Sequence, residues 1–149
     1  MTYKETILVV DDEKSNIDII ASILSKDYNV KTAPNGRVAI DILKEFNVDL
    51  VISDMEMPIM NGIELVQEMK KLNLSADIII ISAHSNTEYL LNSINEGINK
   101  YILKPINKMN LILNVEKTLN YRKLQEERKV FDKILNENVL YYKLDLKGN

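Results

Sequence analysis

The sequence of 149 residues contains no cysteine. This absence excludes a disulfide framework, a thiol nucleophile and a cysteine-based metal site, and it suits a reducing compartment. Long apolar runs are absent as well, since stretches such as residues 78–81 are far too short to span a bilayer. The N-terminal stretch MTYKETILVVDD lacks the long apolar segment of a secretory signal. We therefore expect a cytoplasmic protein without a membrane-spanning segment.

Neither sign of charge dominates, since 19 Lys and Arg residues stand against 22 Asp and Glu residues. Acidic residues exceed basic ones over residues 1–106, whereas basic residues exceed acidic ones from residue 107 onward. The basic segment still mixes both signs, as in YRKLQEERK, which is typical of a solvated helix face and not of a nucleic-acid-binding surface. The length suits one compact domain with a short appendage. No helix-turn-helix follows the predicted domain, so we expect no direct binding of nucleic acid.

Short apolar runs alternate with segments of helical period along the chain. The runs are TILVV (6–10), YNVKTA (28–33), VDLVIS (48–53), DIIIIS (77–82) and KYILK (100–104). The helical segments between them are residues 15–26, 36–46, 62–72 and 87–97, and Gly97 is expected to end the last. In the first segment the apolar face holds Ile19, Ile20, Ile23 and Leu24. This alternation predicts an α/β fold with a parallel sheet, right-handed crossovers and helices on both faces.

Polar residues stand where four of the predicted strands end. They are Asp11 and Asp12 after the first run, Asp54 after the third, Ser82 closing the fourth and Lys104 closing the fifth. In a doubly wound parallel sheet the ligand site lies outside the carboxyl ends of the strands, so these side chains should meet at one edge. Taken singly, such residues are more often helix caps, turn residues or surface lysines. Their joint placement at four strand ends is what predicts a functional site.

The residue types at this edge indicate a chemistry. Carboxylates that lie close together resist joint ionisation, so the acidic cluster needs a cation at neutral pH. Mg²⁺ fits a site with only oxygen ligands and room for water. A carboxylate beside Mg²⁺, a lysine and a hydroxyl has the parts for phosphoryl transfer onto itself. Asp54 is the best candidate for the nucleophile, because the adjacent pair Asp11 and Asp12 suits holding the metal.

Four separated stretches, ILVVDDE, DLVISDMEMPIMNGIEL, IIIISAH and YILKPI, together resemble the receiver domain of response regulators in two-component signalling. They stand in the order and spacing of that family over roughly residues 5–120. The resemblance implies a (βα)5 flavodoxin-like receiver domain over residues 1–120, with a doubly wound parallel sheet of order 2-1-3-4-5. It also implies a switch that accepts a phosphoryl group from a sensor histidine kinase and is enzymatic only in its own phosphorylation and dephosphorylation.

Matched by position, the resemblance makes Asp54 the phosphoacceptor. It implies that Asp12 binds Mg²⁺ directly and Asp11 mainly through water, with the backbone carbonyl of Glu56 as a further ligand. Glu56 and His84 stand at positions that tune the lifetime of the phosphoryl group in this family. His84 could titrate near neutral pH, and the alternative is that both side chains point to solvent. The sequence leaves the sign of their effect open.

The resemblance also implies the parts of a switch. Ser82 corresponds to the hydroxyl residue that moves toward the phosphoryl group, and Tyr101 to the aromatic residue whose ring then turns inward. Lys104 corresponds to the family's invariant lysine, joined to Pro105 by a cis peptide bond. We expect the movement to reshape the face built from the fourth helix, fifth strand and fifth helix, which is the predicted output surface.

Residues beyond 120 exceed a lone receiver domain. The fifth helix is predicted to continue over residues 121–138 as a signalling helix. A coiled-coil spacing is kept there by Tyr121, Leu124, Arg128, Phe131, Leu135 and Asn138. We expect a parallel homodimer through this helix, and the alternative is a solvated helix that packs on its own domain. The stretch 139–149, VLYYKLDLKGN, alternates like a strand before a turn and resembles the opening of a PAS-type sensory domain, which predicts a truncated downstream domain.

Other classes of protein provide the alternatives. A haloacid-dehalogenase-like phosphatase uses the same parts, but its nucleophile would lie on the first strand and its acidic pair late in the chain, opposite to the order here. A flavin-binding protein is disfavoured because no phosphate-cradling loop follows the first apolar run. A scaffold with a silent acceptor site is the third alternative, and the complete set Asp11, Asp12, Asp54, Ser82 and Lys104 argues against it.

Overall fold

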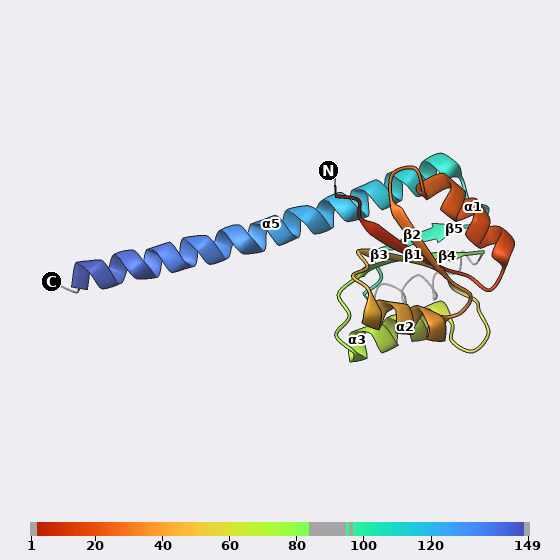
Figure 1. Ribbon diagram of the computed structural model, residues 1–149, viewed down its shortest axis with the longest axis horizontal. Helices are drawn as coiled ribbons and strands as arrows, with labels where there is room; N and C mark the ends of the chain where they lie inside the picture. The colour runs from red at the N-terminus through yellow and green to blue at the C-terminus, as the bar shows by residue number, and fades with distance from the viewer. Residues whose placement is uncertain (1–2, 84–94, 96, 148–149) are drawn as a thin grey trace. The chain divides into compact units, whose positions relative to one another are not determined.

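A computed structural model describes residues 3–83, 95 and 97–147, and the side-chain surroundings of these residues up to residue 138. The chain divides into two compact units, residues 1–118 and residues 119–149. The first unit is built around a five-stranded sheet with helices on both faces, and the second consists of the distal part of the last helix (Figure 1).

All strands of the sheet are parallel, and their order is β2-β1-β3-β4-β5. They are β1 (Thr6–Val10), β2 (Asn29–Ala33), β3 (Leu50–Asp54), β4 (Asp77–Ser82) and β5 (Lys100–Leu103). The predicted α/β fold and strand order are confirmed. The winding reverses between β1 and β3, which places the crevice of the sheet at the carboxyl ends of these two strands.

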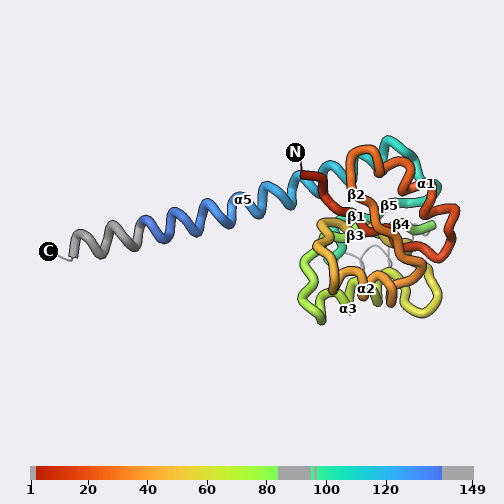
Figure 2. Tube along the Cα trace, in the orientation of Figure 1, coloured from red at the N-terminus to blue at the C-terminus, as the bar shows by residue number. Residues whose placement is uncertain are grey.

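The described helices cover the two faces of the sheet as predicted. They are α1 (Lys14–Leu24), α2 (Gly36–Glu45), α3 (Gly62–Lys71) and α5 (Lys108–Lys147). Within the first unit, α1 and the beginning of α5 lie on one face, and α2 and α3 on the other (Figures 1 and 2). The helix predicted over residues 87–97 lies almost wholly outside the described residues. Gly97 has a φ of +84°, the backbone conformation of a glycine that follows a helix end.

The core follows from the two-residue period of the strands. Alternate strand residues such as Leu8, Val51 and Ile80 form one buried cluster with residues of α2 and α3, including Ile40 and Leu65. The strand residues between them, among them Ile7, Ile52 and Ile79, are also buried. Continuous burial along the central strands is what a parallel sheet covered on both faces requires.

The apolar face of α1 is narrower than predicted. Ile20 and Leu24, four residues apart on one side of the helix, are buried, whereas Ile19 is 51% exposed. Adjacent helical residues are rotated by about 100°, so burying Ile20 turns Ile19 toward solvent. The prediction that Ile19 belongs to the core-facing side is therefore wrong.

A capping box fixes the point at which the chain turns back after β3. Asn61 Oδ1 accepts a hydrogen bond of 2.8 Å from the Glu64 N–H, and Glu64 Oε1 accepts one of 3.2 Å from the Asn61 N–H. The Gly62 N–H donates to the Met55 carbonyl at 2.8 Å. The loop between β3 and α3 is therefore tied at both ends, which holds the segment after Asp54 in place.

The last helix extends farther than the sequence predicted. α5 continues to Lys147, so the strand expected from residue 139 onward is wrong. The alternating apolar residues of VLYYKLDLK favour a strand, but the stretch contains no proline or glycine that would end a helix.

None of the helices in the described part of the chain is long and apolar enough to cross a membrane.

Candidate functional site

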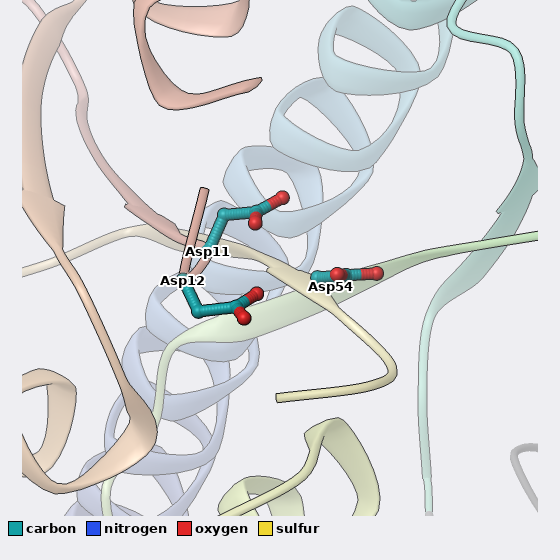
Figure 3. Close-up of side chains that lie close together, drawn as sticks. All are labelled: Asp11, Asp12 and Asp54. Carbon is teal, nitrogen blue, oxygen red and sulfur yellow. The ribbon is translucent and has the colours of Figure 1, made fainter. Parts of the chain in front are cut away.

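Three carboxylates meet at the carboxyl edge of β1 and β3. Asp11 and Asp12 directly follow β1, and Asp54 is the last residue of β3. The register pairs Val10 with Ser53, so the residues that follow on both strands emerge at the same edge. One oxygen of each carboxylate lies within 4.8 Å of the others (Figure 3). The structure thus brings Asp54 together with the adjacent pair Asp11 and Asp12, which lies more than 40 residues earlier in the sequence.

The three carboxylates differ in burial. Asp11 is buried at 3% exposure, the Asp54 side chain is 10% exposed, and Asp12 is exposed. Burial raises the pKa of Asp11, and the charge of Asp54 raises it further. The Glu13 N–H opposes this shift, because it donates a 2.9 Å hydrogen bond to Asp11 Oδ1 and so lowers the pKa. On balance the pKa of Asp11 is raised, so its carboxyl holds a proton more tightly than a free aspartate does.

Asp11→Asn should stabilise the metal-free protein. A carboxyl whose pKa is raised in the folded state binds its proton more tightly there, so its ionisation lowers the free energy of unfolding as the pH rises above the ordinary value of 3.8. Asparagine removes that charge and keeps the oxygen that accepts from Glu13. At pH 7 we expect thermal unfolding without metal to show a gain of about 1 kcal/mol. Destabilisation of the metal-free variant would contradict this account of the cluster.

A lysine that follows the edge strand β5 also contacts Asp54. Lys104 Nζ lies 3.2 Å from Asp54 Oδ1. Lys104 follows β5, and its N–H donates to the Ser82 carbonyl at 2.8 Å, which joins the ends of β4 and β5. The Lys104–Pro105 peptide bond is cis, as the resemblance implied. The ammonium group is therefore placed directly against the candidate phosphoacceptor.

Three of the remaining predicted residues can be described by their burial, and the fourth lies outside the described residues. Ser82 is buried at the end of β4, at 1% exposure. Glu56 is exposed in the loop after β3. Tyr101 is half-buried on β5 and packs against the hydrophobic core. His84 lies outside the described residues, and so does its predicted role.

Ser53 is a residue beside the site that was not among the candidates from the sequence. Its side chain is fully buried, and its Oγ donates a 2.9 Å hydrogen bond to the carbonyl of Asp54. The sequence does contain a signal, because a hydroxyl residue interrupts an otherwise apolar run next to the candidate nucleophile. Such a residue in a buried strand must find a hydrogen-bond partner.

The donor set fits a hard divalent cation. Asp11, Asp12 and Asp54 offer oxygen ligands alone, and among the described residues they form the one group of His, Cys, Asp or Glu side chains close enough to share an ion. Mg²⁺ is commonly bound through one or two carboxylates while it keeps several waters. The exposure of Asp12 leaves the outer side of the cluster accessible to such waters.

The sheet order and the acidic crevice define a CheY-like domain of the flavodoxin type. The chain belongs to the response regulator receiver domain family, whose model matches residues 7–116. Receiver domains accept phosphoryl groups from histidine kinases, typically bind Mg²⁺, and are generally switches rather than enzymes. This family membership decides against the phosphatase and flavin-protein alternatives.

Several relatives illustrate the match. The transcriptional regulatory protein ZraR of Escherichia coli K12 is 37% identical over 114 residues, which are 76% of this chain and 26% of ZraR. A probable cyclic di-GMP phosphodiesterase of Vibrio cholerae is 33% identical over 135 residues, which are 89% of this chain and 29% of that protein. The chain thus spans about a quarter of the length of these curated relatives.

A solved structure shares the fold of this chain over nearly the whole length of the solved protein. The CheY-like receiver domain protein of Methanospirillum hungatei JF-1 superposes with a TM-score of 0.78 at 26% sequence identity. The match covers 83% of this chain and 99% of that one. The receiver fold therefore accounts for most of the present chain.

Proposed function

We propose that this protein is a cytoplasmic phosphorylation switch in which Asp54 accepts a phosphoryl group from a sensor histidine kinase. The observation that carries the proposal is the placement of Asp54 between two kinds of charge. Its carboxylate shares a 4.8 Å cluster with Asp11 and Asp12, and the same side chain lies 3.2 Å from Lys104. A nucleophile, a cation site and a fixed positive charge thus meet at the switch point of the sheet.

In the proposed reaction a carboxylate oxygen of Asp54 attacks the phosphorus atom of phosphohistidine. The new P–O bond forms as the P–N bond breaks, and the imidazole leaves with the electron pair and takes up a proton from solvent. Lys104 offsets the negative charge of the phosphoryl oxygens, and the hydroxyl of Ser82 donates a hydrogen bond to one of them. Asp12, Asp54 and the backbone carbonyl of Glu56 would hold Mg²⁺ directly and Asp11 would hold it through water, and the ion would supply charge neutralisation at the phosphoryl group.

Intact-protein mass spectrometry after incubation with acetyl phosphate tests this function. With Mg²⁺ present, we expect the protein to gain one phosphoryl group, because a small donor needs no kinase surface. With EDTA present, the gain should disappear, since the acids then have no cation to share. If the protein gains no phosphoryl group under either condition, the silent-scaffold alternative is correct.

Phosphorylation should reshape the predicted output surface, which is built from β5, the beginning of α5 and the fourth helix, a segment almost wholly outside the described residues. It replaces one carboxylate charge with a group of higher charge and three acceptor oxygens, to which Ser82 and Lys104 can bind. Tyr101 is half-buried on β5, so its ring can turn inward when Ser82 moves toward the phosphoryl group. Amide hydrogen exchange with and without a stable phosphoryl mimic measures this. Unchanged exchange over residues 82–106 would rule out this output surface.

The second unit is proposed to relay the state as a homodimer that leads to an output module. Its helix exposes apolar side chains at the predicted seam positions Tyr121, Leu124, Phe131 and Leu135, which are 45–64% exposed. Helices that carry apolar residues at this spacing associate by burying them against each other. Light scattering of the phosphorylated protein should give the mass of a dimer. A monomer at high protein concentration would end this part of the proposal.

A further inference from the structure

A buried hydroxyl that the proposed reaction does not use lies directly beside the phosphoacceptor. Ser53 is 0% exposed, and its Oγ donates a 2.9 Å hydrogen bond to the backbone carbonyl oxygen of Asp54. A serine hydroxyl in the interior of a sheet costs free energy unless it is hydrogen-bonded, so this contact fixes the rotamer of Ser53. The contact also fixes the carbonyl group that accepts it.

The carbonyl of Asp54 lies where the regular pairing of β3 changes. The last pair between β1 and β3 is Val10 with Ser53, so Asp54 is one residue beyond the end of the β1 ladder. On another side, a Cβ atom added to Gly62 would come within 2.9 Å of this oxygen, so the start of α3 packs directly against it. The Ser53 hydroxyl thus donates to this carbonyl at a position where β1 no longer pairs with β3. It provides a hydrogen-bond partner for a carbonyl oxygen that is enclosed by the fold.

The backbone after Asp54 is held at consecutive positions. The Met55 N–H donates to the Ile81 carbonyl at 3.0 Å, and the Met55 carbonyl accepts from the Gly62 N–H at 2.8 Å. With the Ser53 contact, three consecutive backbone groups are hydrogen-bonded. They are the Asp54 carbonyl, the Met55 N–H and the Met55 carbonyl. The Ser53 bond is the member of this set that depends on a side chain. It can therefore be removed by substituting one side chain, whereas the two bonds at Met55 join backbone groups and are kept by any such substitution.

We propose that Ser53 is a positioning residue for the cation site, because its hydroxyl fixes the backbone that presents the Asp54 carboxylate and the Glu56 carbonyl to the ion. The inference rests on the proposed function, since it concerns the same site. Its physical basis is that the groups which orient the ligands of a metal control its affinity although they do not touch the metal. Ser53 then acts on binding through Asp54 and not on the phosphoryl group itself.

Isothermal titration of the full chain with Mg²⁺ tests the inference. Ser53→Ala should weaken Mg²⁺ binding about tenfold, the lower end of what orienting residues contribute. Ser53→Cys keeps a weak donor of similar size and should give an intermediate affinity, and Ser53→Thr keeps the hydroxyl and should bind as the native protein does. The titrations are run at a temperature at which circular dichroism shows each variant to be folded.

Thr118→Val is the matched control. Thr118 is also a buried hydroxyl residue, at 5% exposure, and its Oγ1 donates to a backbone carbonyl, that of Asn114, at 2.8 Å within α5. Its removal should lower the melting temperature and leave Mg²⁺ affinity unchanged. If Ser53→Ala binds Mg²⁺ like the native chain, or if both substitutions weaken binding equally, the inference is wrong while the proposed function stands. If the native chain itself does not bind Mg²⁺, the proposed metal site fails, and this inference fails with it.

Discussion

Replacing Asp54 with Asn is expected to abolish phosphoryl uptake from acetyl phosphate, the largest effect that the proposed function predicts. Asparagine matches aspartate in shape, but its amide lacks the charge and the nucleophilic oxygen that the reaction needs. The fold should persist, because the substitution removes a charge that lies close to Asp11 and raises its pKa. Intact-protein mass spectrometry in the presence of Mg²⁺ measures the uptake directly.

Asp41→Asn provides the control for this substitution. Asp41 is an exposed residue of α2, so the same chemical change is made far from the acidic cluster along the chain. This variant should gain one phosphoryl group, as the native protein does. Uptake that persists in Asp54→Asn would show that another residue is the acceptor, and the roles assigned at the crevice would then have to be revised.

Gly62→Ala is expected to have the largest effect on stability. Gly62 is buried at the first position of α3, where a Cβ atom would lie 2.9 Å from the carbonyl oxygen of Asp54 and 3.1 Å from Cα of Met55. Both neighbours are backbone atoms of the segment that carries the phosphoacceptor, so they cannot move aside as a flexible side chain could. We expect a loss of about 1–3 kcal/mol in the free energy of unfolding, the usual cost of overpacking.

Urea unfolding of this variant beside Gln67→Ala measures the effect. Gln67 is exposed on the same helix, so its replacement by alanine should change stability by less than about 0.5 kcal/mol. The expected loss in Gly62→Ala should come with weaker Mg²⁺ binding, because the shifted backbone belongs to the cation site. Equal stabilities of the two variants would show that the loop after β3 yields easily, contrary to the close approach at Gly62.

The parts of this fold that could be predicted depend on patterns with a fixed period. Five apolar runs separated by helical segments indicate a parallel sheet, and the acids that follow the first and third runs are then placed at one edge by the sheet topology alone. The contact of Lys104 with Asp54 follows from the same rule, since both residues stand at carboxyl ends of strands. The sheet topology, together with the residues at the strand ends, thus predicts most of the site.

The features that could not be predicted depend on the direction in which a side chain faces and on sequence patterns that fit both a strand and a helix. Ile19 has the right residue type for the core, but the sequence does not show how far the apolar stripe of α1 extends around the helix. The stretch from residue 139 satisfies a strand-like alternation and is helical, because nothing ends α5 before it. The role of Ser53 depends on a hydrogen bond to the next residue's carbonyl, which arises only once β1 has ended.

A crystal structure of the protein grown with Mg²⁺ tests the central claim most directly, namely that acids from two strands share one divalent ion. The account predicts one ion that is bound by oxygens of Asp12 and Asp54 and by the backbone carbonyl of Glu56, with Asp11 held to it through water and Lys104 beside Asp54. A structure at saturating Mg²⁺ in which the crevice holds no ion, or in which Asp11 and Asp12 turn away from Asp54, would contradict it.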